Sequence, residues 1–178
     1  GGFPGGVWVV GVLGADLVWA GRGFGVWFLG GGGAAGGVLG PVLREGPKQL
    51  LVVNRTAERA SQLALEFAEL GPIEGGAIDL VGGRQFDLII NATSAGLSGE
   101  APQLPGSLLT ERSCCYDMVY GPEPTPFMRW SAHHAAWAVA DGLGMLVEQA
   151  GESFYIWRNE RPQTLPVINQ LREAMVVA

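Results

Sequence analysis

The sequence has little of the chemistry that metal sites and disulfide frameworks require. Its 178 residues include only two cysteines and two histidines, and both pairs are adjacent, at Cys114-Cys115 and His133-His134. Adjacent cysteines inside an apolar run are typical of buried, reduced thiols. With so few ligating side chains, the sequence predicts neither a bound metal ion nor a disulfide-stabilised domain.

Positive charge is also scarce. The 11 lysines and arginines are outnumbered by 17 acidic residues, the net charge is −6, and Lys48 is the single lysine. An acidic chain without a basic stripe is poorly suited to nucleic acid or to an anionic membrane surface, so we expect neither as a partner. The first residues also lack the basic segment of a signal peptide, and we therefore expect a cytoplasmic protein.

Long hydrophobic runs are absent too. The longest uncharged stretch, residues 23–43, contains a glycine run and is better explained as strand, turn and helix than as a membrane helix of about 20 apolar residues. Residues 1–25 are so rich in glycine that ordering them would cost much backbone entropy, and we assign them to no domain. We expect residues 26–178 to form one domain.

From residue 26 onward, short apolar runs alternate with helical patterns. This alternation predicts an α/β fold, namely a doubly wound, mostly parallel, Rossmann-like sheet with helices on both faces. Pro41 is expected to kink the first helix or to end its regular part. The predicted strands cover residues 26–29, 49–53, 76–78, 86–90, 114–118 and 136–140, and the predicted helices 34–45, 57–70, a short segment from 126, 142–157 and 162–175.

A glycine-rich turn and a basic corner point to a dinucleotide site. The run Gly30-Gly31-Gly32-Gly33-Ala34 lies between a strand and a helix, where exposed backbone N–H groups suit a pyrophosphate. The next strand runs into Asn54-Arg55-Thr56, with Arg59 one helical turn later. Two guanidinium groups and a hydroxyl favour a 2′-phosphate, so the pattern predicts NADP rather than NAD. The alternative is a tight turn beside two solvated arginines.

Polar residues recur where the predicted strands end. In a doubly wound sheet, ligands bind outside the carboxyl ends of the strands. We therefore expect one site built from several loops. These loops are Gly30–Gly33, Asn54–Thr56, Asn91–Ser94, Met118–Tyr120 and Asp141-Gly142.

Six ordered segments resemble shikimate dehydrogenase. The resemblance covers roughly residues 26–178 and is to the C-terminal, NADP-binding domain of that family. It implies an NADP-dependent oxidoreductase of aromatic amino-acid biosynthesis that reversibly oxidises shikimate to 3-dehydroshikimate. The segments are Gly30–Ala34, Asn54–Thr56, Asn91–Gly96, Tyr116–Tyr120, Thr125–Phe127 and Asp141–Ala150.

The resemblance also implies roles for individual residues. Tyr120 and Gln149 would reach the carboxylate and hydroxyls of shikimate. The residues that would hold NADP are Gly30, Gly31, Gly32, Gly33 and Ala34 at the pyrophosphate, Asn54, Arg55, Thr56 and Arg59 at the 2′-phosphate, Asn91 and Thr93 along the groove, and Met118 and Gly142 beside the nicotinamide.

Each of these side chains has a simpler structural explanation. Tyr120 could be an ordinary amphipathic residue at the rim, and Gln149 could only face solvent. Asn91 could be a turn former, and Asp141 is expected to act mainly as a helix N-cap.

The sequence departs from the family at the proton donor that carbonyl reduction requires. The family supplies a lysine and a nearby aspartate before the glycine loop, whereas Lys48 follows the loop and precedes the second strand, at the amino edge of the predicted sheet. We therefore assign no catalytic residue and expect this chain alone to bind NADP with little or no turnover. Two alternatives stay open, an NAD-preferring quinate/shikimate oxidoreductase and a non-catalytic nucleotide-binding module. We expect a monomer or a homodimer.

Overall fold

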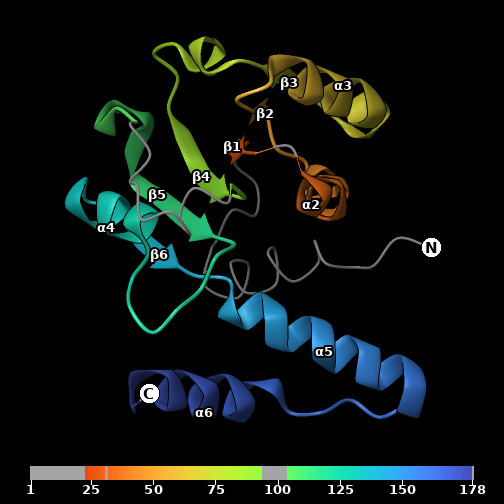
Figure 1. Cartoon of the computed structure of the whole chain (residues 1–178). Coiled ribbons are helices and arrows are strands. Elements are labelled where there is room, and N and C mark those ends of the chain that lie inside the picture. The colour runs from red at the N-terminus through yellow and green to blue at the C-terminus, as the bar shows by residue number, and fades with distance from the viewer. Residues whose placement is uncertain (1–22, 31, 94–103, 178) are drawn as a thin grey trace.

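The protein is built on one parallel sheet of six strands. The computed structural model describes residues 23–30, 32–93 and 104–177. The strand order is β3-β2-β1-β4-β5-β6, and every pairing between neighbours is parallel (Figure 1). The strands are β1 (Gly25–Leu29), β2 (Gln49–Val53), β3 (Ile73–Gly76), β4 (Phe86–Asn91), β5 (Leu109–Asp117) and β6 (Ala138–Ala140).

Helices cover both faces of this sheet, as predicted. In Figure 1, α2 and α3 lie on one side of the sheet and α4 on the other, while α5 and α6 extend beyond the carboxyl ends of the strands. The doubly wound α/β fold expected from the sequence is therefore confirmed. The helices are α2 (Gly33–Arg44), α3 (Ala57–Phe67), α4 (Pro126–His133), α5 (Leu143–Arg158) and α6 (Thr164–Val177), with short 3-10 turns η1 (Ala68–Leu70), η2 (Ile78–Val81) and η4 (Gly106–Leu108).

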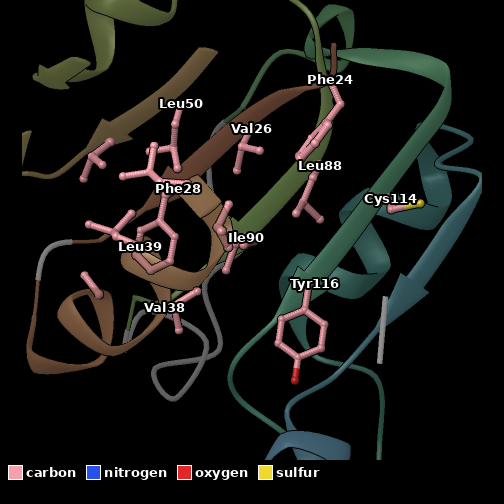
Figure 2. Close-up of a cluster of buried hydrophobic side chains, with 14 of the residues drawn as sticks. Phe24, Val26, Phe28, Val38, Leu39, Leu50, Leu88, Ile90, Cys114 and Tyr116 are labelled. Atoms are coloured by element: carbon pink, nitrogen blue, oxygen red, sulfur yellow. The ribbon is translucent and has the colours of Figure 1, made fainter. Parts of the chain in front are cut away.

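The alternation of side chains along β1 divides the core into two layers. Val26 and Phe28 pack with α2 and Ala60 of α3, in the cluster drawn in Figure 2. Trp27 and Leu29 point to the opposite face, in the cluster that contains Phe127 and Trp130 of α4. Because both faces are buried, the strands are nearly continuous apolar runs.

The sequence predicts that Pro41 kinks the first helix or ends its regular part, and the second of these alternatives is wrong. The helix α2 runs through Pro41 to Arg44. Val42 and Leu43, which follow the proline, are almost completely buried against the sheet. Their burial favours another helical turn although Pro41 supplies no N–H group to the helix.

Several predicted boundaries also move. The strand predicted at residues 76–78 is wrong, because β3 spans Ile73–Gly76 and residues 78–81 form η2. The strand β5 begins at Leu109 rather than at 114, since its first half contains the exposed, charged Glu111 and Arg112 and lacks an apolar pattern. The last strand and the last helix begin two residues later than predicted, at Ala138 and Thr164. Among the described residues, no helix combines the length and apolarity needed to cross a bilayer.

The adjacent cysteines lie in β5, on opposite faces of the sheet. Both are completely buried. Cys114 belongs to the core cluster that includes α2, and Cys115 belongs to the cluster that includes α4. Burial raises the pKa of Cys114 to about 12 and the pKa of Cys115 to about 11. Both thiols are therefore protonated and shielded at neutral pH, as the sequence predicts for structural cysteines.

We expect the folded protein to resist alkylation. At about pH 8, below both raised pKa values, few thiolates form, and the thiolate is the reactive species. Iodoacetamide should leave Cys114 and Cys115 unmodified in buffer and modify both in concentrated urea, as measured by intact mass. Rapid modification of the folded protein would contradict the burial of β5.

Candidate functional site

Four strands end side by side at the carboxyl edge of the sheet. Leu29 at the end of β1 pairs with Val53 of β2 and with Asn91 of β4, and Asn91 pairs with Asp117 of β5. The strand order reverses between β1 and β4, which is the position where open α/β sheets bind ligands. The predicted gathering of polar loops at one edge is therefore confirmed.

The glycine turn leaves the start of α2 open. Gly30 has a φ of +113°, which favours glycine, and its N–H donates to the carbonyl of Val53 at 2.8 Å. Gly32 precedes the helix without a side-chain cap, and a methyl group placed on Gly32 or Gly33 would meet nothing within 4 Å. This N-terminus therefore has free N–H groups and space for an anion. Gly31 lies outside the described residues, and Ala34 belongs to the first turn of α2.

The basic corner lies at the end of β2 and the start of α3. Asn54 is tied to the sheet, because its N–H donates to the carbonyl of Gly76 at 3.2 Å. Arg55, Thr56 and Arg59 are exposed, and the hydroxyl of Thr56 does not cap the helix that it precedes. Within the described parts of the chain, neither guanidinium takes part in an ion pair. These side chains are therefore available to a ligand with a phosphate.

The side chain of Asn91, at the end of β4, is buried and holds the neighbouring Thr93 in place. Only 2% of it is exposed. Its Oδ1 accepts from the N–H and the hydroxyl of Thr93 at 3.2 and 2.7 Å, and its Nδ2 donates to Oδ1 of Asp117 at 3.1 Å. The side chain of Asn91 is thus engaged within the protein, and the partly exposed Thr93 is the member of the pair that can face a ligand.

Asp117 at the end of β5 is a buried carboxylate that the sequence analysis did not single out. It is completely buried, and its Oδ1 accepts from Asn91 and from the N–H of Val119, while its Oδ2 accepts from the hydroxyl of Thr125. Burial raises the pKa of this carboxyl, and the three hydrogen bonds oppose that shift. The sequence does contain a signal for this residue, because Asp117 is an acidic residue that directly follows the apolar run Cys114-Cys115-Tyr116.

Met118 and Gly142 meet where β5 and β6 end. The N–H of Met118 donates to the carbonyl of Asn91 at 2.9 Å, and the N–H of Gly142 donates to the carbonyl of Val119 at 3.3 Å. A Cβ atom on Gly142 would lie 2.2 Å from the carbonyl oxygen of Met118. Glycine is therefore required at position 142 for the two loops to approach this closely.

The two residues expected to reach the substrate are both accessible. Tyr120 is 41% exposed, and Gln149 lies on the exposed side of α5. Neither side chain hydrogen-bonds to another residue in the described ranges. Both can therefore bind a polar ligand, although the structure does not bring them into contact with one another.

Asp141 does more than cap α5. Its Oδ1 accepts from the N–H of Leu143 at 3.2 Å, which agrees with the expected capping role. Both carboxylate oxygens also accept from the guanidinium of Arg172 at 2.6 Å, so that α6 is tied to the start of α5. This bidentate contact raises the pKa of Arg172. It borders a cavity of about 730 Å³ between the loop at residues 121–124, α5 and α6.

Lys48 lies on the opposite side of the molecule from these loops. Its N–H donates to the carbonyl of Phe24 at 2.9 Å, at the amino ends of β1 and β2. Its predicted position away from the carboxyl edge is confirmed. Across residues 23–30, 32–93 and 104–177, no group of three or more His, Cys, Asp or Glu side chains could hold a metal ion.

Comparisons with known proteins agree with this arrangement. Residues 142–172 match the family model described as the shikimate 5'-dehydrogenase C-terminal domain. A shikimate dehydrogenase (NADP(+)) from Thioalkalivibrio sulfidiphilus is 55% identical over 163 residues, which are 92% of this chain and 56% of that relative. The chain is a relative of the shikimate dehydrogenases.

Solved structures of shikimate dehydrogenases share the fold. One in complex with NADP+ has a TM-score of 0.80 at 26% identity, covering 97% of this chain and 61% of the other. The enzyme from Thermus thermophilus, in complex with shikimate, has a TM-score of 0.74 at 31% identity, with the same two coverages. The chain thus spans just over half the length of the shikimate dehydrogenases that it matches.

Gly142 offers a direct test of the contact between these loops. We expect Gly142→Ala to lower the free energy of unfolding by about 1–3 kcal/mol, because the methyl group would displace the backbone of Met118. Urea denaturation measures this loss. Gly83→Ala is the matched control and should change stability by less than about 0.5 kcal/mol, since a methyl group at that exposed position meets nothing within 4 Å. Equal stabilities would contradict the close approach.

Proposed function

We propose that this chain is the NADP-binding domain of a shikimate dehydrogenase, with residues 26–178 forming the domain. The whole protein would be a cytoplasmic enzyme, monomeric or homodimeric, that reversibly oxidises shikimate to 3-dehydroshikimate in aromatic amino-acid biosynthesis. The single observation that carries this proposal is the pair of exposed guanidinium groups of Arg55 and Arg59. They form no ion pair with the residues that the structure describes and lie one strand away from the N-terminus of α2.

The residues present fit NADP along the whole carboxyl edge. The pyrophosphate fits the turn at Gly32 and Gly33, where, among the residues that the structure describes, no side chain caps the helix or approaches the two glycines. The 2′-phosphate fits the guanidinium groups of Arg55 and Arg59, because guanidinium groups bind phosphate through charge-assisted hydrogen bonds. The nicotinamide end then falls beside Thr93, Met118 and Gly142.

Shikimate would bind next to the nicotinamide end. Its carboxylate and hydroxyls can accept hydrogen bonds from the phenol of Tyr120 and the amide of Gln149, which are both exposed and have no side-chain hydrogen bond to a described residue. Bound NADP+ would supply the hydride acceptor for the oxidation of shikimate. The hydroxyl proton would have to be taken up by a base.

This chain provides no lysine for that proton transfer. Lys48 is the single lysine of the sequence and is held at the amino edge of the sheet, away from the proposed cofactor residues. The 178 residues alone should therefore bind the cofactor and not complete the reaction. This observation also keeps a second candidate open, a nucleotide-binding module without catalysis.

We expect the two arginines to decide which dinucleotide binds. Each charged hydrogen bond to the 2′-phosphate contributes roughly 1.5–3 kcal/mol, so Arg55→Ala and Arg59→Ala should each weaken NADP about tenfold or more. Binding of NAD, which lacks this phosphate, should not change. Isothermal titration calorimetry with both dinucleotides measures the difference.

Arg84→Ala is the matched control for these variants. Arg84 is a partly exposed arginine that precedes β4 at the amino edge and pairs with Glu74 at 3.0 Å. Its removal should leave both dissociation constants unchanged. Equal affinity of the unmodified chain for NADP and NAD would instead favour an NAD-preferring quinate/shikimate oxidoreductase.

Turnover is the second test of the proposal. The 178-residue chain, mixed with NADP and shikimate, should produce little or no NADPH while calorimetry shows that NADP binds. Normal NADPH formation, followed by absorbance, would contradict the expected inactivity of this stretch. If a longer protein containing this chain binds NADP but fails to bind shikimate, the non-catalytic module becomes the better explanation.

A further inference from the structure

The carboxylate of Asp117 connects three segments of the carboxyl edge. Its partners are Nδ2 of Asn91 at 3.1 Å, the N–H of Val119 at 3.1 Å and the hydroxyl of Thr125 at 2.5 Å. It is completely buried and has no ion-pair partner among the described side chains. A buried carboxylate without a cation is costly unless hydrogen bonds satisfy it, so the position of Asp117 depends on these three donors.

Two of the donors belong to segments that contain residues of the proposed nicotinamide end. Asn91 holds Thr93 through two hydrogen bonds. Val119 follows Met118 and precedes Tyr120, and its carbonyl accepts from the N–H of Gly142 at 3.3 Å.

The third donor fixes the start of α4. The hydroxyl of Thr125 donates to Asp117 and accepts from the N–H of Met128 at 3.2 Å, so it caps the first turn of the helix. One carboxylate thus sets the relative positions of the loops after β4 and β5 and of the start of α4.

The adenosine side of the site does not share this network. Arg55 follows β2 and Arg59 lies in the first turn of α3. Among the described residues, no hydrogen bond connects their side chains to Asn91, Asp117 or Thr125. The two ends of the site are therefore positioned by different interactions. Substitution of Asp117 should therefore change the geometry of the nicotinamide end and leave the adenosine end unchanged.

We propose that Asp117 is a positioning residue that sets the nicotinamide end of the cofactor site without affecting the adenosine end. This inference rests on the proposed function, because it requires that NADP binds along the carboxyl edge. The residue acts through Val119 and Asn91, which place Met118 and Thr93, and it does not touch the cofactor itself.

The test compares a whole cofactor with its adenosine half. Adenosine 2′,5′-bisphosphate carries the 2′-phosphate and one 5′-phosphate but no nicotinamide, so it reports on Arg55, Arg59 and the glycine turn and not on the nicotinamide end. In Asp117→Ala, we expect NADP+ to bind about tenfold more weakly, whereas the bisphosphate should bind within about twofold of the unmodified chain. General damage to the fold would weaken both ligands together. Calorimetry at one temperature, below the thermal unfolding of all variants, gives both constants.

Asp87→Ala is the matched control. Asp87 is partly buried, whereas Asp117 is completely buried, and like Asp117 it accepts a backbone hydrogen bond, from the N–H of Gly25 at 2.7 Å, but at the amino edge of the sheet. This variant loses a carboxylate contact of the same kind on the opposite side of the molecule. Its affinities for NADP+ and for the bisphosphate should both stay within about twofold of the unmodified values.

Asp117→Asn keeps the test decisive if the alanine variant does not fold. The amide oxygen can still accept from Val119 and Asn91, but the amide nitrogen cannot accept from Thr125. We therefore expect an intermediate, selective loss of about threefold for NADP+ and none for the bisphosphate.

The possible outcomes separate this inference from the proposed function. Unchanged NADP+ binding in Asp117→Ala, or an equal loss for both ligands, would overturn the positioning role while the proposed function stands. If the alanine variant does not fold, unchanged NADP+ binding in the asparagine variant would overturn it in the same way. If the unmodified chain binds neither NADP+ nor the bisphosphate, the proposed function itself fails.

Discussion

The parallel register of the sheet is the constraint on which the rest of the structure depends. Parallel neighbours require crossover connections, and these place helices over both faces. Val26 and Phe28 are then buried on one face and Trp27 and Leu29 on the other, so the strands have little room for polar side chains. The strand ends are the positions left for polar chemistry, and the register brings those ends to one edge.

This constraint explains how much of the fold and of the site could be predicted from the sequence. The strand at residues 49–53 is apolar and bounded by turns, and its predicted limits match β2. Once alternating strands and helices indicate a parallel sheet, the residue after each strand can be assigned to the same edge. The gathering of Asn54, Asn91 and Asp141 at that edge follows, and so does the position of Lys48 at the other edge. None of this requires knowledge of side-chain contacts.

What the sequence did not predict depends on contacts between distant segments. Asn91 and Asp117 are 26 residues apart, and Asp141 and Arg172 are 31 apart, so no local pattern indicates either pairing. The strand β3 contains Gly75 and Gly76, which have no apolar side chain to display a strand pattern. A methyl group on Gly75 would lie 2.0 Å from the carbonyl oxygen of Ala60, so the packing of α3 on this strand explains that glycine. Local propensity does not contain this information.

The two ends of the site are built in different ways, and the proposed chemistry gives a reason. At the proposed adenosine end, Arg55 and Arg59 are exposed and form no ion pair with any described residue, which suffices for a phosphate because charge attraction tolerates small displacements. At the nicotinamide end, hydride transfer requires the reacting atoms to be held in near contact, where a displacement of about 1 Å can cost a hundredfold in rate. Burying the carboxylate of Asp117 without a cation disfavours folding, but three donors offset that cost and fix the loops beside Met118. In the proposed site, the hydrogen bonds that fix the loops are therefore concentrated at the end where hydride transfer demands exact geometry, and the end that only binds is formed by exposed charged side chains.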